Sequence, residues 1–136
     1  MKIEHALEKY LINPVTRAML LAGVAPRAFA LLETTGRRSG KRRRIPVGNG
    51  LEGDVFWVVS AHGEPSAYVQ NLIAEPRVRV KVGRRWRSGR ASLLTGDDGL
   101  ARRHELDRRN GIAGRMDGAI FRAVASDVAT VRIDLD

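Results

Sequence analysis

The chain contains no cysteine among its 136 residues. Disulfide bonds and thiolate-ligated metal sites are therefore excluded, and the composition is compatible with a reducing compartment. Histidine is also scarce: only His5, His62 and His104 are present, and they are scattered along the sequence. A histidine-rich metal site is therefore not expected.

Acidic residues are few relative to basic ones. Asp and Glu together number 15 and Lys and Arg number 24, which gives a formal net charge of +9. Such an excess favours anionic partners, such as nucleic acid, anionic lipid or an anionic small molecule. Charge alone does not distinguish among these three classes.

No long hydrophobic run is present. The apolar stretch at residues 18–32 contains Pro26 and Arg27 and is too short to span a bilayer. The N-terminus is interrupted by Glu4 and Glu8 and lacks the apolar region of a signal peptide. We therefore expect a soluble cytoplasmic protein, folded as a single domain over residues 1–136 with an N-terminal helical segment at residues 1–25.

Several catalytic motifs are also missing. The sequence has no nucleophile elbow, no phosphate-binding P-loop and no dinucleotide-binding glycine motif after a predicted strand. Ser39 and Ser60 have no histidine and carboxylate that the sequence marks as partners. If the protein is an enzyme, the chemistry belongs to a bound organic cofactor that the protein orients.

The most informative stretch is the basic, glycine-containing segment at residues 34–47. Gly36 and Gly40 bracket Arg37, Arg38 and Ser39. Glycine lets the backbone approach a ligand closely, and successive N–H groups in such a turn can form an anion-binding nest. Arginine side chains suit phosphate and carboxylate groups. The segment therefore predicts a seat for a small, multiply anionic group, although a solvated turn or a nucleic-acid contact remains an alternative.

Helical periodicity and capping residues predict helices at four places. Asn13 followed by Pro14 is a typical helix start, and Ser66 can cap a later helix that Pro76 ends. Val69, Leu72 and Ile73 would form the apolar face of that later helix. The expected helices cover residues 3–11, 14–21, 67–74 and 97–109, and a further short helix is expected near residues 120–125.

Alternating and β-branched residues predict six strands. Pro46 limits its strand to a sheet edge or a bulge, and Gly89 suggests a bulge in another strand. Residues 50–54 are expected to be a hairpin connection. The expected strands cover residues 28–35, 44–49, 55–60, 77–82, 86–94 and 128–135. Adjacent strands with hairpin links indicate an α+β fold, an antiparallel split β-barrel with flanking helices.

Some patterns have two readings. Basic and apolar residues alternate over residues 77–82, which suits either a nucleic-acid stripe or a half-exposed strand, and we favour the strand. The N-terminal helices could touch a membrane, although packing on the core is favoured. Packing is the commoner role for Tyr68, and capping or bracing a loop is the commoner role for Asn71.

The combination of segments resembles the deazaflavin-dependent nitroreductase family. The resemblance covers roughly residues 14–95, and the final strand also fits the fold. Its segments are Leu31-Leu32-Glu33-Thr34-Thr35-Gly36-Arg37-Arg38-Ser39-Gly40, then Arg43 and Pro46-Val47, then Val58-Val59-Ser60-Ala61-His62-Gly63, then Ala67-Tyr68-Val69-Gln70-Asn71-Leu72, then Glu75-Pro76-Arg77-Val78. The family has a split β-barrel fold and binds coenzyme F420.

The resemblance implies a cofactor site made of three groups of residues. The first group would hold the phosphate and the carboxylate-bearing tail, the second would line the deazaflavin ring, and the third would lie near the tail or at positions matching a family tryptophan and asparagine. The first group is Arg37, Arg38, Ser39, Gly40 and Arg43. The second group is Pro46, Val47, Gly48, Val59, Ser60 and Ala61. The third group is His62, Gly63, Tyr68 and Asn71.

The sequence departs from the family pattern in places. His62 stands where a lysine-like residue is common, and Ala61 lacks a hydroxyl that some members place near the substrate. Residues 110–125 contain no tyrosine, whereas the nitroimidazole-reducing members have a tyrosine-rich segment there. Cofactor binding is thus better supported than one particular reductase activity.

The resemblance implies hydride transfer from reduced F420 to an electrophilic small molecule, such as a quinone, a nitroaromatic or an enone. Nucleic acid is not the expected partner, while a homodimer and a peripheral membrane contact stay open. The rival interpretations are a basic barrel that binds nucleic acid and a split barrel that binds FMN or haem.

Overall fold

The computed structural model describes residues 29–63, 65–111, 121–122, 125 and 128–136. The helical segment expected at residues 1–25 lies outside these residues. Of the short helix expected near residues 120–125, only Phe121, Arg122 and Ala125 are described.

The described chain forms seven strands and two helices, in the order expected from the sequence. The strands are β1 (Phe29–Thr35), β2 (Arg42–Gly48), β3 (Leu51–Glu52), β4 (Val55–Ser60), β5 (Arg77–Val82), β6 (Arg85–Leu94) and β7 (Ala129–Leu135). The helices are α3 (Ala67–Ala74), between β4 and β5, and α4 (Gly99–Arg109), between β6 and β7.

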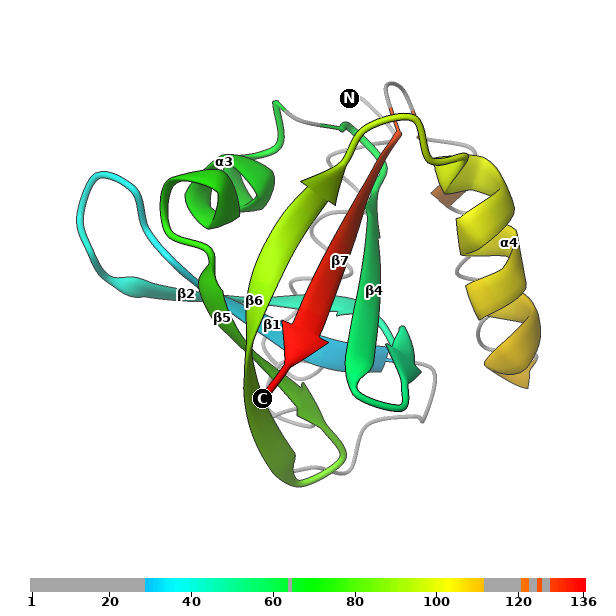
Figure 1. Cartoon of the computed structure of the whole chain (residues 1–136), viewed down its shortest axis with the longest axis horizontal. Coiled ribbons are helices and arrows are strands. Elements are labelled where there is room, and N and C mark those ends of the chain that lie inside the picture. Colours follow the sequence, from blue (N-terminus) through cyan, green and yellow to red (C-terminus); the bar gives the residue numbers. More distant parts are fainter. Residues whose placement is uncertain (1–28, 64, 112–120, 123–124, 126–127) are drawn as a thin grey trace, which may run out of the picture.

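All seven strands belong to one antiparallel sheet in the order β2-β1-β5-β6-β7-β4-β3. The sheet curls into a half-barrel, with α3 near the loop that joins β1 to β2 and α4 alongside β4 and β7 (Figure 1). The predicted fold class, an antiparallel split barrel with flanking helices, is confirmed.

Two apolar clusters hold the fold together. The first fills the inside of the curled sheet, and α3 contributes Leu72 to it. The second lies between β4 and α4 and is built around Trp57, Val59, Leu106 and Phe121. Since successive side chains of a strand point to opposite faces, β4 feeds both clusters, with Phe56 and Val58 in the first.

The segment predicted as a hairpin at residues 50–54 contains a short strand of its own. Leu51 pairs with Phe56 and Glu52 with Val55, so the turn is only Gly53 and Asp54. This hairpin joins β3 to β4, whereas β2 lies at the opposite edge of the sheet. Of the two alternatives for the strand containing Pro46, a sheet edge or a bulge, the structure shows the edge.

Three local predictions were wrong in whole or in part. Ser66 is the N-cap residue of α3, as predicted, but its side chain makes no capping hydrogen bond and its Oγ lies 2.9 Å from Ser60 Oγ. Ile73 is 45% exposed and does not belong to the buried face of α3. Gly89 forms no bulge, because its pairing with both neighbouring strands is unbroken. It is instead a close approach, where an added Cβ would lie 2.7 Å from the backbone oxygen of Asp134.

Among the described residues, no helix combines the length and the apolar character that crossing a bilayer requires.

Candidate functional site

The loop between β1 and β2 has a defined backbone structure. Gly36 N–H donates to Lys41 O over 2.7 Å, and Gly40 N–H donates back to Gly36 O over 2.8 Å. Gly40 has φ of 70°, a conformation that side-chain-bearing residues rarely adopt. Gly36 thus closes the loop, and Gly40 permits its left-handed turn.

Asn71 of α3 fastens this loop to the body of the molecule. Its Oδ1 accepts from the backbone N–H of Arg37 over 3.2 Å and from Arg37 Nη1 over 2.9 Å. Its Nδ2 lies 3.5 Å from Thr34 Oγ1, and Asn71 is only 6% exposed. Asn71 therefore braces the loop, as its sequence context suggested, and it uses Arg37 for this purpose.

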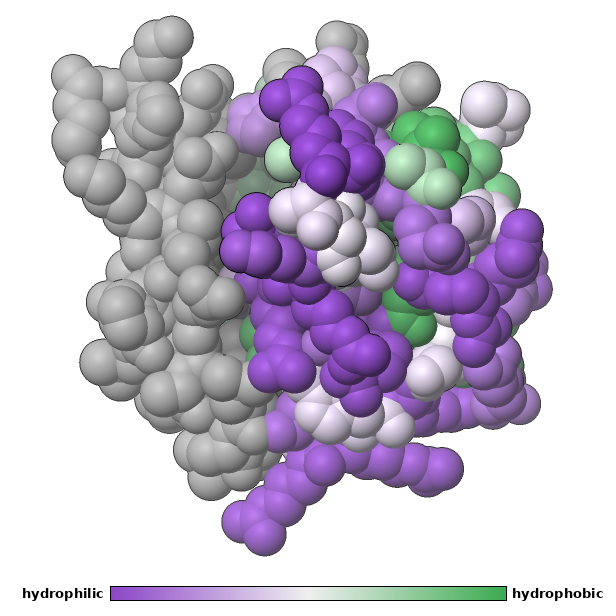
Figure 2. Space-filling view, turned by 90° about the vertical axis from the view of Figure 1, so that its left-hand side faces the viewer, coloured by the Kyte–Doolittle hydropathy of each residue, from purple (hydrophilic) through white to green (hydrophobic). Residues whose placement is uncertain are grey.

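The remaining cations of the loop are on the surface. Arg38, Lys41 and Arg43 are exposed, and within the described residues their side chains make no hydrogen bond or ion pair. The backbone N–H groups of Arg38 and Ser39 also make no hydrogen bond to the described part of the chain. Hydrophilic residues dominate the described part of the surface on the side that carries this loop (Figure 2). The loop thus offers two N–H groups and at least three positive charges to an anion.

The end of β2 approaches α4 at Gly48. The three atoms closest to a Cβ built on Gly48 all belong to the guanidinium of Arg103, at 3.6 to 3.8 Å. Arg103 is 9% exposed, and its Nε donates to both carboxylate oxygens of Asp107 over 2.9 and 3.1 Å. Arg103 was not singled out from the sequence. The only sequence signal for it was its spacing of four residues from Asp107, which allows an ion pair along a helix.

The end of β4 carries a small hydroxyl cluster. Ser60 is 1% exposed, and its Oγ donates to Gly63 O over 3.1 Å. Burial raises the pKa of the Tyr68 hydroxyl, while a hydrogen bond with Ser60 and the charge of Arg103 act in the opposite direction. Residues of β4, α3 and α4 therefore meet around Tyr68.

Some of the predicted site residues have side chains that pack in the two apolar clusters. Val59 and Ala61 pack in the cluster between β4 and α4, together with Trp57. Val47 packs against the cluster inside the barrel. These side chains have packing partners in the described structure. Pro46, Gly48 and His62 are half-buried.

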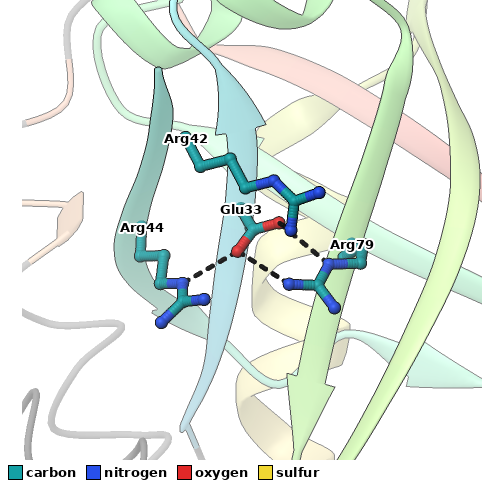
Figure 3. Close-up of polar contacts among 4 residues, drawn as sticks. All are labelled: Glu33, Arg42, Arg44 and Arg79. Atoms are coloured by element: carbon teal, nitrogen blue, oxygen red, sulfur yellow. Dashed lines mark hydrogen bonds and ion pairs between the residues drawn. The ribbon is translucent and has the colours of Figure 1, made fainter.

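A second charged cluster, on β1, β2 and β5, was not foreseen. Glu33 is 4% exposed and accepts hydrogen bonds from Arg44 over 2.8 Å and from Arg79 over 2.8 and 3.0 Å (Figure 3). Burial alone would raise the pKa of Glu33, but the hydrogen bonds from Arg79 and Arg44 outweigh it and lower the pKa. Arg42 completes the cluster, with Nη1 at 3.6 Å from Glu33 Oε1.

The basic face of β5 is covered by this cluster and by Trp86. The guanidinium carbon of Arg79 lies 4.6 Å from the centre of the Trp86 ring, and Lys81, 8% exposed, lies over the same ring at 5.8 Å. These contacts engage the cations with protein partners. They therefore favour the interpretation of this segment as a strand whose cationic stems pack over the sheet.

The residues present fit the two chemically different parts of coenzyme F420. The anionic tail suits the exposed arginines and the two N–H groups of the β1–β2 loop. The resemblance places the ring at the end of β2, where the Arg103 guanidinium lies 3.6 to 3.8 Å from a Cβ built on Gly48. In the described residues, no cluster of histidine and carboxylate side chains could hold a metal ion.

Comparison with known proteins gives a family match. The family model described as F420H(2)-dependent quinone reductase matches residues 13–127. Among curated proteins, no sequence is similar enough to count as a match.

Solved structures share the fold at low sequence identity. An F420-H2 dependent reductase is 22% identical with a TM-score of 0.56, covering 79% of this chain and 94% of that chain. An F420 reductase is 19% identical with a TM-score of 0.59, covering 86% and 90%. The heme storage protein from Vibrio cholerae is 13% identical with a TM-score of 0.54, covering 100% and 92%. The fold is thus shared by F420 reductases and a heme storage protein, and the fold alone does not select the cofactor.

Proposed function

Because the chain belongs to the F420H(2)-dependent quinone reductase family, we propose that it passes a hydride from reduced F420 to a small electrophile, with a quinone as the first candidate substrate. The membership makes the protein an oxidoreductase that uses coenzyme F420. A nitroaromatic or an enone is the second candidate class, since both accept a hydride at an electron-poor carbon or nitrogen.

The loop between β1 and β2 is proposed to hold the anionic tail of the cofactor. The supporting observation is the division of labour among its arginines. Arg37 is engaged by Asn71, whereas Arg38 and Arg43 are exposed and make no ion pair within the described residues. A loop that is fixed by one arginine can present the others at little further cost in conformational entropy.

The ring is proposed to lie beside the end of β2, near Gly48, Ser60 and Tyr68. When bound, the deazaflavin supplies the hydride-transfer chemistry at C5. The chain supplies proximity, orientation and fixed positive charge around the site. The structure assigns no general acid, so the proton that completes the reduction is taken from solvent in this scheme.

The experiment is a fluorescence titration of the purified protein with F420, repeated with FMN and with a short DNA duplex at two salt concentrations. We expect saturable F420 binding at micromolar concentration or below, weaker FMN binding, and no DNA binding of comparable strength. Salt-sensitive DNA binding in place of F420 binding would favour the basic-barrel interpretation. A preference for FMN would overturn the cofactor assignment for this site.

The loop assignment is tested by the double variant Arg38→Ala/Arg43→Ala. Each charge-assisted contact is worth about 1.5–3 kcal/mol, so loss of both should weaken F420 binding by about 100-fold or more. The matched control Arg84→Ala/Arg108→Ala removes the same charge from other elements and should change affinity by less than about threefold. Equal losses in the two double variants would show that net charge, and not the loop, holds the tail.

The substrate is identified by mixing reduced F420, the protein and one electrophile under anaerobic conditions and following the return of oxidised F420. Quinones, nitroaromatics and enones are tested as separate classes. We expect the highest kcat/KM with quinones. Turnover of none of the three classes by an F420-binding protein would refute the substrate proposal and leave the cofactor proposal intact.

A further inference from the structure

The first three residues of β2 are all arginines, so charge alone does not decide which of them faces which side of the sheet. Successive side chains of a strand point to opposite faces, so Arg42 and Arg44 share one face and Arg43 takes the other. A shift of one residue in the pairing with β1 would exchange these faces. Because β2 lies at the edge of the sheet, β1 is the strand that fixes its register.

Glu33 of β1 holds two of these arginines on one face. Glu33 is 4% exposed, lies opposite Arg44 in the pairing of the two strands, and accepts a hydrogen bond from Arg44 Nε over 2.8 Å (Figure 3). Arg42 Nη1 approaches the same carboxylate at 3.6 Å. Two hydrogen bonds from Arg79 of β5, over 2.8 and 3.0 Å, also hold the carboxylate. Glu33 is thus fixed to β5 and attaches β2 through the face that carries Arg42 and Arg44.

Arg43 lies on the opposite face, beside the β1–β2 loop. It pairs with Thr34, which contacts Asn71 of α3, so it shares the face of the sheet against which α3 packs. Arg43 Nε lies 3.6 Å from a Cβ built on Gly36, and the hydroxyl oxygen of Ser39 lies 2.9 Å from the same point. Arg43 is exposed and makes no hydrogen bond or ion pair within the described residues. Its charge therefore lies in solvent next to the turn of the loop.

Apolar packing also favours this register. Ile45 and Val47 are on the same face as Arg43 and pack against the core inside the curled sheet. Both are only half-buried, and both follow the arginines in the strand. Glu33 acts at the other end of β2, where the strand leaves the loop.

We propose that Glu33 is a positioning residue for binding of the anionic cofactor tail, and that it acts through Arg43. By holding Arg42 and Arg44 on one face of β2, Glu33 keeps Arg43 on the face of the loop, next to Ser39. This inference rests on the proposed function, in which Arg43 holds the tail. It gives a buried carboxylate a part in binding an anion that its own charge repels.

The sign of the effect on binding separates positioning from simple electrostatics. Glu33→Gln removes a negative charge near the loop, and by Coulomb's law alone this would strengthen binding of an anionic cofactor. If Glu33 positions Arg43, the same substitution weakens F420 binding instead. The loss cannot exceed that of Arg43→Ala, which is about tenfold or more for one charge-assisted contact, and we expect about three- to tenfold in a fluorescence titration.

A double-mutant cycle shows whether Glu33 acts through Arg43. F420 is titrated into the parent protein, Glu33→Gln, Arg43→Ala and the double variant. In the Arg43→Ala background, Glu33→Gln should not weaken binding further, because the residue that it positions is gone. A loss as large as in the parent background would show a general structural effect and overturn the proposal. An Arg43→Ala variant that binds F420 as well as the parent would overturn it too.

Asp54→Asn is the matched control. Asp54 lies in the turn between β3 and β4, at the opposite edge of the sheet, and its carboxylate also pairs with an arginine, Arg87, over 2.8 Å. The substitution removes the same charge and should change F420 affinity by less than about twofold. A weakening equal to that in Glu33→Gln would contradict positioning.

Glu33→Gln should fold, because the side chains of its three arginine partners are at least 31% exposed and water can hydrate them. Circular dichroism checks this. If it does not fold, Arg44→Gln takes its place in the cycle, since it releases β2 while Arg79 still satisfies the carboxylate. Unchanged or stronger F420 binding in the folded variant would refute the role of Glu33 and leave the F420 site in place. Failure of the parent protein to bind F420 would instead refute the proposed function, and this inference with it.

Discussion

Asn71→Ala removes the brace between α3 and the β1–β2 loop. The substitution deletes two contacts with Arg37, at 3.2 and 2.9 Å, and a longer contact with Thr34 at 3.5 Å. Arg37 is exposed, so water can replace part of what it loses, and we expect a cost of about 2 kcal/mol in the free energy of unfolding. For a chain of this length, that corresponds to a fall in melting temperature of roughly 6–10 °C.

The assay is thermal unfolding followed by circular dichroism, paired with an F420 titration of each variant. Ile73→Ala on the same helix is the control, because Ile73 is 45% exposed and its truncation should change stability by less than about 0.5 kcal/mol. Asn71→Asp keeps the acceptor that Arg37 uses but adds a negative charge beside the loop. It should retain most of the stability and lose about tenfold or more in F420 affinity.

A melting temperature for Asn71→Ala within about 1 °C of the parent would refute the bracing argument, since the buried amide would then contribute almost nothing. A double-mutant cycle with Arg37→Ala measures the contact directly. We expect a coupling free energy of about 1–2 kcal/mol, and additive effects of the two substitutions would contradict the observed contact.

Three further predictions concern single positions. Gly48→Ala should fold normally, because its Cβ would be in ordinary contact at 3.6 Å, but it should weaken F420 binding in a titration; unchanged affinity would place the ring elsewhere. The lowered pKa of Glu33 means that its ion pairs stabilise the fold above its ordinary value of 4.5 and lose that contribution as the pH falls through the lower folded-state pKa. Glu33→Gln should therefore flatten the dependence of stability on pH in acid, and an identical acid profile would contradict this. Gly89→Ala should lower stability by about 2 kcal/mol or more in denaturant unfolding, since its Cβ would lie 2.7 Å from the Asp134 oxygen; a neutral effect would show that the strands can move apart.

Local patterns were sufficient to predict most of the described fold. The alternation in β5 placed Val78 and Val80 in the core, and both are buried. The edge position of β2 followed from the missing N–H of Pro46. The failures had non-local causes: Gly89 is constrained by β7 on its far side, and Ser66 is engaged by Ser60 instead of by the helix that follows it.

The contacts within the candidate site could not be predicted from the sequence. The glycines and arginines of the β1–β2 loop indicate an anion-binding site, which stays a prediction, and Asn71 was expected to brace a loop. Nothing in the local sequence showed that Arg37 would be its partner, because the two residues are brought together only by the packing of α3 against β1. Arg103 was missed for the same reason, since its approach to Gly48 depends on where α4 packs.

The position of β2 at the rim of the sheet has a consequence for solubility. An edge strand offers unpaired backbone groups on which another chain can build a continuous sheet. Pro46 interrupts that row of groups, and Arg42 and Arg43 bring positive charge that repels an approaching copy. Variants that strip charge from this region should therefore be more prone to aggregation, so light scattering should accompany their binding measurements. Arg43, which is proposed to hold the cofactor tail, thus also helps to keep the molecules apart.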